Sequence, residues 1–262
     1  MKRCLWLSMF VALTLTGTVA FAADECTKIT ATGHPDYPVI AYKDGDKIIG
    51  AAPTLVETIA KQINVPLESN YTGTWEEAQA AARDGKADMI FGIYYNDERA
   101  TYLDYVQPAF TFDDVAVFVV KGKEFPFTDK NDLIGKKGVT NVGESYGNEF
   151  DAFLKEKLNV ARTNGIDAAF KDLVDGKADY LIAGYFPGLA EAAKQGLKDK
   201  VVALNQALLS QEMFVAFSKK SPCKSLASKF GEGITQLTTD DSYDKVVKNA
   251  TTAWDNAQKS NE

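Results

Sequence analysis

The five letters DGKAD stand at residues 84–88 and again at residues 175–179. Each copy follows a segment in which apolar residues recur at helical spacing, and each leads into a short apolar run and an aromatic pair. These flanking segments are 75–83, 89–91 and Tyr94-Tyr95 for the first copy, and 166–174, 180–183 and Tyr185-Phe186 for the second. The repeat predicts two similar α/β units, and two facing units enclose a cleft.

The first 22 residues have the pattern of a secretory signal peptide. Met1-Lys2-Arg3 is basic, the stretch from Cys4 to about Val19 is apolar, and Ala20-Phe21-Ala22 provides a small-residue cleavage site. The predicted cut lies between Ala22 and Ala23. An uncleaved membrane anchor is the alternative, although the apolar core is short for a bilayer of about 30 Å.

The charge of the exported chain argues against two classes of partner. The full chain has a net charge of −7, and without Lys2 and Arg3 the 36 acidic residues face 27 basic ones, a net charge of −9. An acidic chain is poorly suited to nucleic acid or anionic lipid. The acids are scattered along the chain, which is typical of a soluble surface and leaves the sign of a ligand open.

Two cysteines remain after the signal peptide, Cys26 and Cys223. An even pair in an oxidising compartment predicts a disulfide between the start of the first unit and a late helix. Two buried free thiols are the alternative. With two cysteines and one histidine, a zinc site is not expected.

Short apolar runs alternate with amphipathic segments, which predicts an α/β protein with largely parallel sheets. The expected strands are 27–32, two pieces within 41–49 around Asp44-Gly45, 67–71, 87–91, 115–120, 138–141, 160–163, 178–183 and 213–217. The expected helices begin at Pro53 and cover 75–83, 148–158, 166–174, 189–195, 223–238 and 242–257.

The order of these elements predicts a hinge made of two chain crossings. The chain leaves the first unit near 112–115 and returns to it near 211–214. Two independent domains in tandem are disfavoured, because the final helices lack the strands needed for a third unit. A two-strand hinge permits closure around a ligand.

Five ordered motifs support a resemblance to a known family. Residues 92–99, GIYYNDER, resemble the segment "GMSITPER", and residues 104–110, DYVQPAF, resemble "DFSDPYY". Residues 133–137 resemble "DLKGKK", residues 141–145 resemble "QAGST", and Ser242–Lys245 with Trp254 also match. The mature chain therefore resembles the periplasmic solute-binding proteins of ABC importers, family 3, the amino-acid-binding type.

The resemblance implies a two-lobed periplasmic binding protein fold of type II, in which each lobe is a mostly parallel sheet flanked by helices. It divides the chain into a signal peptide (1–22), lobe 1 (23–113), lobe 2 (114–211) and a return to lobe 1 (212–262). It implies a monomer in the periplasm that delivers a small-molecule ligand to the membrane subunits of an ABC permease, without a cofactor, a metal or catalytic residues.

The resemblance also implies a ligand site. Arg99 would hold a carboxylate, for which the planar guanidinium fork is suited; a surface arginine on a short helix is the alternative. Gly92 would offer a backbone carbonyl and Tyr94 a hydroxyl, while Tyr37 and Trp75 would sandwich the ligand or serve the core. Ser145 would bind the carboxylate from lobe 2 at the start of a helix.

One position departs from the pattern of amino-acid binders. The family places an acid five residues after Asp179 to pair with the ligand's α-ammonium group, and this chain has Gly184 followed by Tyr185. A buried, unpaired ammonium is costly. Either another acid serves, with Glu144 favoured over Asp36, or the ligand lacks an α-ammonium group or places it against aromatic faces such as Tyr185.

His34, the single histidine, lies three residues before Tyr37. It either bonds the ligand and makes binding pH-dependent, or lies on a solvent-facing loop. Two other functions stay open: a lyase or dehydratase on the same fold, and a soluble ligand sensor for a membrane receptor. The enzyme is disfavoured because no nucleophile–base pair is recognisable.

Overall fold

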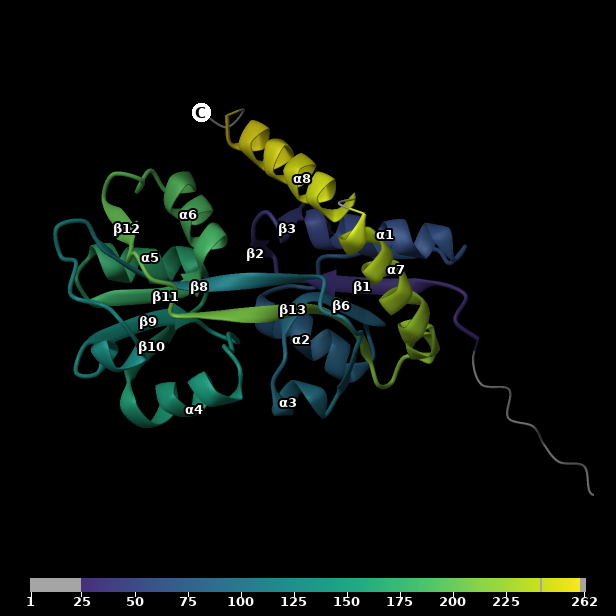
Figure 1. Ribbon diagram of the computed structural model, residues 1–262, viewed down its shortest axis with the longest axis horizontal. Coiled ribbons are helices and arrows are strands. Elements are labelled where there is room, and N and C mark those ends of the chain that lie inside the picture. The colour runs from purple at the N-terminus through teal and green to yellow at the C-terminus, as the bar shows by residue number, and fades with distance from the viewer. Residues whose placement is uncertain (1–24, 241, 260–262) are drawn as a thin grey trace, which may run out of the picture.

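A computed structural model describes residues 25–240 and 242–259, and it shows two α/β lobes side by side along one continuous sheet (Figure 1). The predicted signal peptide and its cleavage site lie outside the described residues. Within the described residues, no helix is both long and apolar enough to span a bilayer.

The main sheet has the strand order β10-β9-β11-β8-β13-β6-β1-β5, with β12 added to β8 and β7 added to β13. Lobe 1 contributes β1 (Ile29–Gly33), β5 (Leu67–Ser69), β6 (Met89–Tyr94) and β7 (Leu103–Tyr105). Lobe 2 contributes β9 (Lys137–Asn141), β10 (Asn159–Thr163), β11 (Tyr180–Gly184) and β12 (Val201–Ala203). A separate three-stranded sheet in lobe 1 consists of β2 (Asp36–Tyr37), β3 (Ala41–Asp44) and β4 (Lys47–Ile49).

Most helices lie on the faces of the sheet, whereas the C-terminal helix packs on two other helices of lobe 1 (Figure 1). Those of lobe 1 are α1 (Ala51–Gln62), α2 (Trp75–Asp84), α3 (Asp97–Ala100), α7 (Ala227–Thr239) and α8 (Ser242–Lys259). Those of lobe 2 are α4 (Asn148–Lys157), α5 (Ile166–Val174) and α6 (Tyr185–Lys194). Two short 3₁₀ helices are Lys130–Leu133 and Pro222–Leu226.

The two long strands β8 (Thr111–Val120) and β13 (Leu209–Ser218) cross between the lobes. They pair with each other over 111–115 and 209–213, after which β8 continues beside β11 and β13 continues beside β6. These are the two crossings expected near 112–115 and 211–214. The division of the chain at residues 113/114 and 211/212 stays a prediction.

The DGKAD repeat has a structural counterpart. In each lobe it joins a helix to the strand nearest the crossing strands, from α2 to β6 and from α5 to β11. Its last residue binds the neighbouring parallel strand in both copies: the Asp88 carboxylate accepts from Thr30 N at 2.8 Å, and the Asp179 carboxylate accepts from Lys137 N at 2.7 Å. The two copies of the sequence DGKAD therefore form the same helix-to-strand junction, one in each lobe.

The aromatic pairs that follow do not have equivalent positions. Tyr94 ends strand β6 as expected, but Tyr185 and Phe186 begin helix α6 instead of ending a strand. The expected helix over 189–195 therefore starts four residues earlier. Pro187 lies in the first turn of α6, where the missing proline N–H leaves no helical hydrogen bond unmade.

A disulfide joins Cys26, just before β1, to Cys223, just after β13. It connects two segments of lobe 1 that are 197 residues apart in the sequence. In between, the chain passes through lobe 2 and returns.

Candidate functional site

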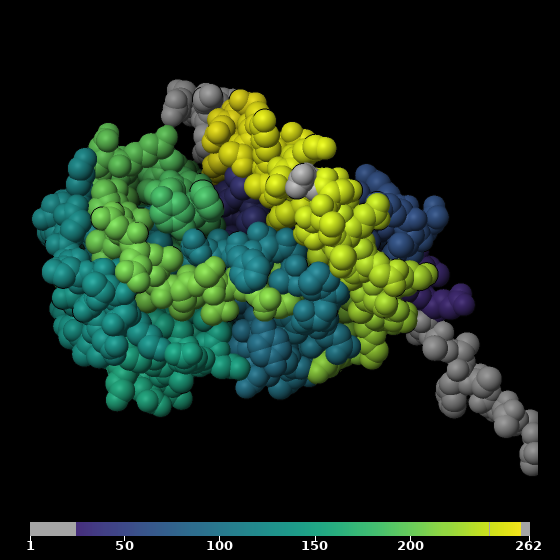
Figure 2. All heavy atoms as spheres, in the orientation of Figure 1, coloured from purple at the N-terminus to yellow at the C-terminus, as the bar shows by residue number. Residues whose placement is uncertain are grey.

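The lobes meet at the loop that follows β9, and Figure 2 shows the teal atoms of lobe 2 against the blue atoms of lobe 1. Among the described residues, five side-chain hydrogen bonds cross the interface. They are His34 Nε2 to Glu144 Oε1 (3.1 Å), Gln79 Nε2 to Gly143 O (3.1 Å), Arg99 Nη2 to Gly143 O (3.1 Å), Asn96 Nδ2 to Ser145 Oγ (2.6 Å) and Asp97 N to Asn148 Oδ1 (3.0 Å).

The space left between the lobes beside His34 and Glu144 is small. A cavity of about 10 Å³ lies between His34, Tyr37, Glu144 and Gly184, among other residues. That volume suits about one water molecule. A larger solute can therefore enter only when the lobes part or the side chains of the cleft rearrange.

Arg99 lies at the centre of the interface, with 3% of its surface exposed. The short helix α3 places it there, capped by Asn96, whose side chain accepts from Arg99 N at 2.7 Å. Its guanidinium donates to Gln79 Oε1 and Tyr94 O at 3.0 Å, and to Gly143 O at 3.1 Å. All three acceptors are neutral, and no acidic side chain of the described residues forms an ion pair with it.

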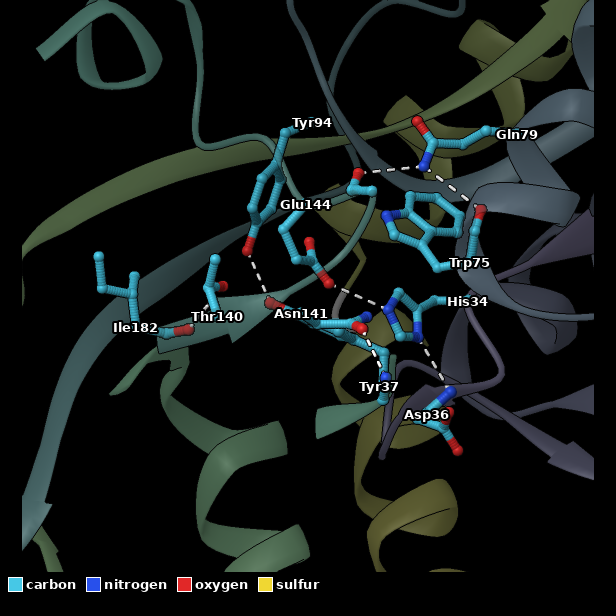
Figure 3. A network of polar contacts seen from close by, with 12 residues as sticks. His34, Asp36, Tyr37, Trp75, Gln79, Tyr94, Thr140, Asn141, Glu144 and Ile182 are labelled. Carbon is cyan, nitrogen blue, oxygen red and sulfur yellow. Dashed lines mark hydrogen bonds and ion pairs between the residues drawn. The ribbon is translucent and has the colours of Figure 1, made fainter. Parts of the chain in front are cut away.

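Trp75 forms an aromatic wall beside Arg99. It is the first residue of α2, which is fixed by a capping box between Thr74 and Glu77. The Arg99 guanidinium lies 5.5 Å from the centroid of the Trp75 ring. The centroid of the His34 ring lies 4.9 Å from that of Trp75. The indole nitrogen of Trp75 is buried with no hydrogen-bond partner among the described residues, and it points toward the loop that carries Glu144 (Figure 3).

His34 is buried in the cleft and does not lie on a solvent-facing loop. Its Nδ1 accepts from Asp36 N at 2.9 Å, so its Nε2 carries the proton and donates to Glu144 Oε1 at 3.1 Å. These contacts specify a neutral ring that joins lobe 1 to an acid of lobe 2. Figure 3 shows His34 and Glu144 directed toward each other, with Trp75 beside the His34 ring and the Tyr37 hydroxyl directed toward Tyr94.

Gly92 and Tyr94 lie on β6 at an irregularity of the sheet. In the pairing of β6 with β13, Ile93 faces Phe214 and Phe91 faces Val215, so Gly92 is the extra residue of a bulge. Its φ of 71° is a conformation that favours glycine. The bulge directs Tyr94 into the interior between the lobes, where its hydroxyl lies 2.7 Å from that of Tyr37.

Both of these hydroxyls donate to one carboxylate oxygen of Asp113 on the crossing strand β8. Burial raises the pKa of Tyr37 and of Tyr94 well above the ordinary range, so both phenols are neutral donors. Burial also raises the pKa of Asp113 to about 6, although the two tyrosine hydrogen bonds act in the opposite direction.

Gly184 lies directly against this cluster. A Cβ atom added to Gly184 would lie 2.1 Å from the Tyr37 hydroxyl oxygen and 3.1 Å from Asp113 Oδ2. Any side chain at position 184 would therefore displace Tyr37. An acid at this position, where the family pattern places one, would collide with the Tyr37 hydroxyl.

Ser145 lies at the interface, but its hydroxyl is fully used: it accepts from Asn96 and donates to Asp151 of α4. Tyr185 lies apart from the other predicted residues. It begins α6 with 37% of its surface exposed, and its ring contacts Phe186. Asp36 contributes its backbone N–H to the cluster, and its residue surface is exposed.

The sequence pattern did not indicate Asp113, Gln79 or Asn96. Gln79 carried a signal, because it shares a face of α2 with Trp75, Ala78 and Ala82, which are apolar. Asp113 carried a weaker one, as an acid within a strand. A larger hollow of about 600 Å³ is lined by residues of both lobes and of the crossing strand β13, among them Tyr95, Asn148 and Gln211, and none of the predicted site residues lines it.

Two lobes joined by two crossing strands, with polar and aromatic residues of both lobes gathered between them, define a two-lobed solute-binding protein. Residues 29–252 match the family model of the bacterial extracellular solute-binding proteins, family 3. The chain belongs to this family, and the expected fold class is confirmed.

Curated relatives match this chain over most of their length. The chain is 26% identical over 220 residues to a probable histidine-binding protein of Campylobacter jejuni, covering 82% of this chain and 81% of that one. It is 23% identical over 228 residues to the probable amino-acid-binding protein YxeM of Bacillus subtilis, covering 85% of this chain and 83% of the relative.

Solved structures share the fold. A histidine kinase sensor domain similar to periplasmic binding proteins has a TM-score of 0.72 at 23% identity, covering 88% of this chain and 97% of that one. The amino acid ABC transporter substrate-binding protein AbpA of Streptococcus pneumoniae, bound to L-arginine, has a TM-score of 0.71 at 21% identity, covering 87% of this chain and 96% of that one.

Proposed function

We propose that this protein binds a small carboxylate-bearing solute, an amino acid or a close relative of one, outside the cytoplasm and without catalysis. The observation that carries the proposal is Arg99, a buried guanidinium at the lobe interface whose acceptors in the described part of the chain are all neutral. A buried cation without a counter-ion is unfavourable, and a ligand carboxylate would neutralise it. The curated relatives named as histidine- and amino-acid-binding proteins support this ligand class.

Binding would follow an open-to-closed transition. In the open form the solute reaches Arg99, Trp75 and Tyr94 on lobe 1. Closure then brings the loop with Gly143, Glu144 and Ser145 onto it, and the ligand stabilises the closed form by the contacts it makes only there. The closed form would deliver the solute to the membrane subunits of an ABC permease, after export through the signal peptide.

A ligand screen tests the ligand class. The probes are L-histidine, L-arginine and L-glutamine, each with its des-amino analogue: imidazolepropionate, 5-guanidinovalerate and glutaramate. A probe that binds only the folded protein raises the unfolding midpoint as its concentration exceeds Kd. If neither these compounds nor any other standard amino acid binds, the proposal is refuted. Conversion of a stabilising compound into product would support the lyase alternative.

Substitution of Arg99 tests the carboxylate contact. We expect Arg99→Ala to abolish the ligand-dependent shift, and Arg99→Lys to weaken binding at least tenfold because lysine lacks the planar fork. Arg83→Ala is the matched control, since Arg83 lies on α2 with a largely exposed side chain that pairs with Glu98. Unfolding midpoints without ligand establish that each variant folds, and an unchanged shift in folded Arg99→Ala would contradict the assignment.

A further inference from the structure

Two uncompensated charges of opposite sign lie between the lobes. Arg99 is the buried cation, and Asp113, with 6% of its surface exposed, is the buried acid. Asp113 forms no ion pair with a lysine, arginine or histidine of the described residues, and its only hydrogen bonds there come from two neutral tyrosine hydroxyls. A solute carrying both a carboxylate and an ammonium group would compensate both charges at once.

The position of Asp113 suits a cation in the cleft. It lies on the crossing strand β8, where both lobes meet, and its Oδ2 is 3.1 Å from the point that a side chain at Gly184 would occupy. Tyr37 and Gly184, which flank it, line the cleft cavity. Both tyrosine bonds go to Oδ2, so Oδ1 makes no hydrogen bond within the described part of the chain.

The other acids near the cleft are already engaged or exposed. The Glu144 carboxylate accepts from His34 across the interface. Asp151 accepts from Ser145 and from Tyr146 N. Asp36 is exposed, and Asp114, adjacent to Asp113 on β8, is exposed as well. Asp113 and Glu144 each keep one carboxylate oxygen without a hydrogen bond in the described part of the chain, and Asp113 is the more buried of the two and has no histidine or other basic partner there.

We infer that Asp113 binds the α-ammonium group of the ligand from the hinge strand β8, a role that the lobe 2 strand end at Gly184 does not fill. The inference rests on the proposed function and deepens it. It assigns the ligand to the α-amino acids and excludes simple carboxylates as the preferred class. Tyr37 and Tyr94 position the carboxylate by donating to it.

Asp113→Asn tests the assignment because it removes the charge and keeps the shape. The matched control is Asp114→Asn, one residue along the same strand and exposed. Titration calorimetry measures the Kd of the tightest-binding L-amino acid in the panel and the Kd of its des-amino analogue. We expect the wild-type protein and Asp114→Asn to prefer the amino acid by at least 100-fold, and Asp113→Asn to reduce this preference to less than about fivefold.

The outcomes separate the inference from the proposed function. If Asp113→Asn keeps the full preference for the amino acid, the inference is wrong while solute binding stands. If the wild-type protein prefers the des-amino analogue, the inference is also wrong, and a carboxylate without an amine is the ligand. If the wild-type protein binds no amino acid and no analogue, the proposed function itself fails.

A measurement on the wild-type protein covers the case in which Asp113→Asn does not fold. With the pKa of Asp113 at about 6, an ammonium bound beside it would expel its proton. We expect binding of the amino acid at pH 6 to release about half a proton, and binding of the des-amino analogue to release none. Calorimetry in buffers of different ionisation enthalpy measures the number of protons released. Tyr37, Tyr94 and Tyr243 also face Asp113, but their raised pKa values keep them neutral at this pH.

Two further acids, Asp114 and Glu144, act on Asp113 electrostatically. The same titration with the variants Asp114→Asn and Glu144→Gln tests whether either of these acids is the source of the released proton. Release that persists in both variants supports Asp113. Equal release for the amino acid and its analogue, or release that disappears with Glu144→Gln, would overturn the inference.

Discussion

At the scale of single residues, the cleft contains groups that are unfavourable for folding. Asp113 is a buried carboxylate, and within the described part of the chain Arg99 is a guanidinium without an acidic partner and the Trp75 indole nitrogen is buried without a hydrogen-bond partner. Each of these groups would lower the free energy of unfolding. Their concentration at one lobe interface is typical of a binding site, where a ligand supplies the missing partners.

The raised pKa of Asp113 predicts how the free energy of unfolding changes with pH. Its pKa is raised from 3.8 to about 6 by burial, so the folded state binds its proton more tightly than the unfolded state. The stabilisation from this proton is complete below about pH 3.8 and is lost as the pH rises through 6. The wild-type protein should therefore lose up to about 3 kcal/mol relative to Asp113→Asn between pH 4 and pH 7.5.

Urea unfolding of both proteins at these two pH values measures this difference. Asp114→Asn provides the control, since its side chain is exposed and should show little change relative to the wild-type protein. A difference between the wild-type protein and Asp113→Asn that is the same at pH 4 and pH 7.5 would show that Asp113 does not titrate in this range.

At the scale of elements, the two DGKAD junctions are alike in backbone but not in surroundings. Asp88 accepts from Thr30 N, from the Thr30 hydroxyl and from the Ser221 hydroxyl. The Asp179 carboxylate is exposed and, within the residues that the structure describes, accepts from Lys137 N alone. The junction in lobe 1 is therefore connected to β1 and to the segment that follows β13, whereas the junction in lobe 2 is connected to β9 only.

This difference predicts unequal effects of the same substitution in the two copies. Asp88→Ala leaves three donors without their acceptor and should cost about 2–3 kcal/mol, while Asp179→Ala leaves one exposed donor and should cost about 1 kcal/mol or less. Chemical denaturation of the two variants gives both values. Equal costs would mean that the backbone junction alone, and not its surroundings, sets the stability.

The same contrast explains what could be predicted from the sequence. Helix 166–174 has identical predicted and observed bounds, because its apolar spacing is local information. The beginning of α6 at Tyr185 was missed, since an aromatic pair after an apolar run is also typical of a strand end. Asp113 was missed because its burial depends on Tyr37 and Tyr94, which are 76 and 19 residues away in the sequence.

At the scale of the whole molecule, the chain passes the hinge twice and is closed on itself by the disulfide. Cys26 precedes β1, Cys223 follows β13, and all of lobe 2 lies in the sequence between them. The cleft begins at the other end of β1, with His34 directly after Gly33. Five strand residues at about 3.3 Å each separate the two ends, so the bond lies far from the ligand site.

Removal of the disulfide should therefore reduce stability and leave binding unchanged. The double variant Cys26→Ser, Cys223→Ser frees a loop with a sequence separation of 197 residues, and the chain-entropy relation predicts a loss of about 5 kcal/mol of unfolding free energy. Denaturation of oxidised wild-type protein and of the double variant measures the loss, and reduced wild-type protein serves as the control. The affinity for the tightest-binding panel amino acid should change less than threefold. A larger loss of affinity in a folded variant would show that the bond also positions the cleft, and that the stability of lobe 1 and the geometry of the site are coupled along β1.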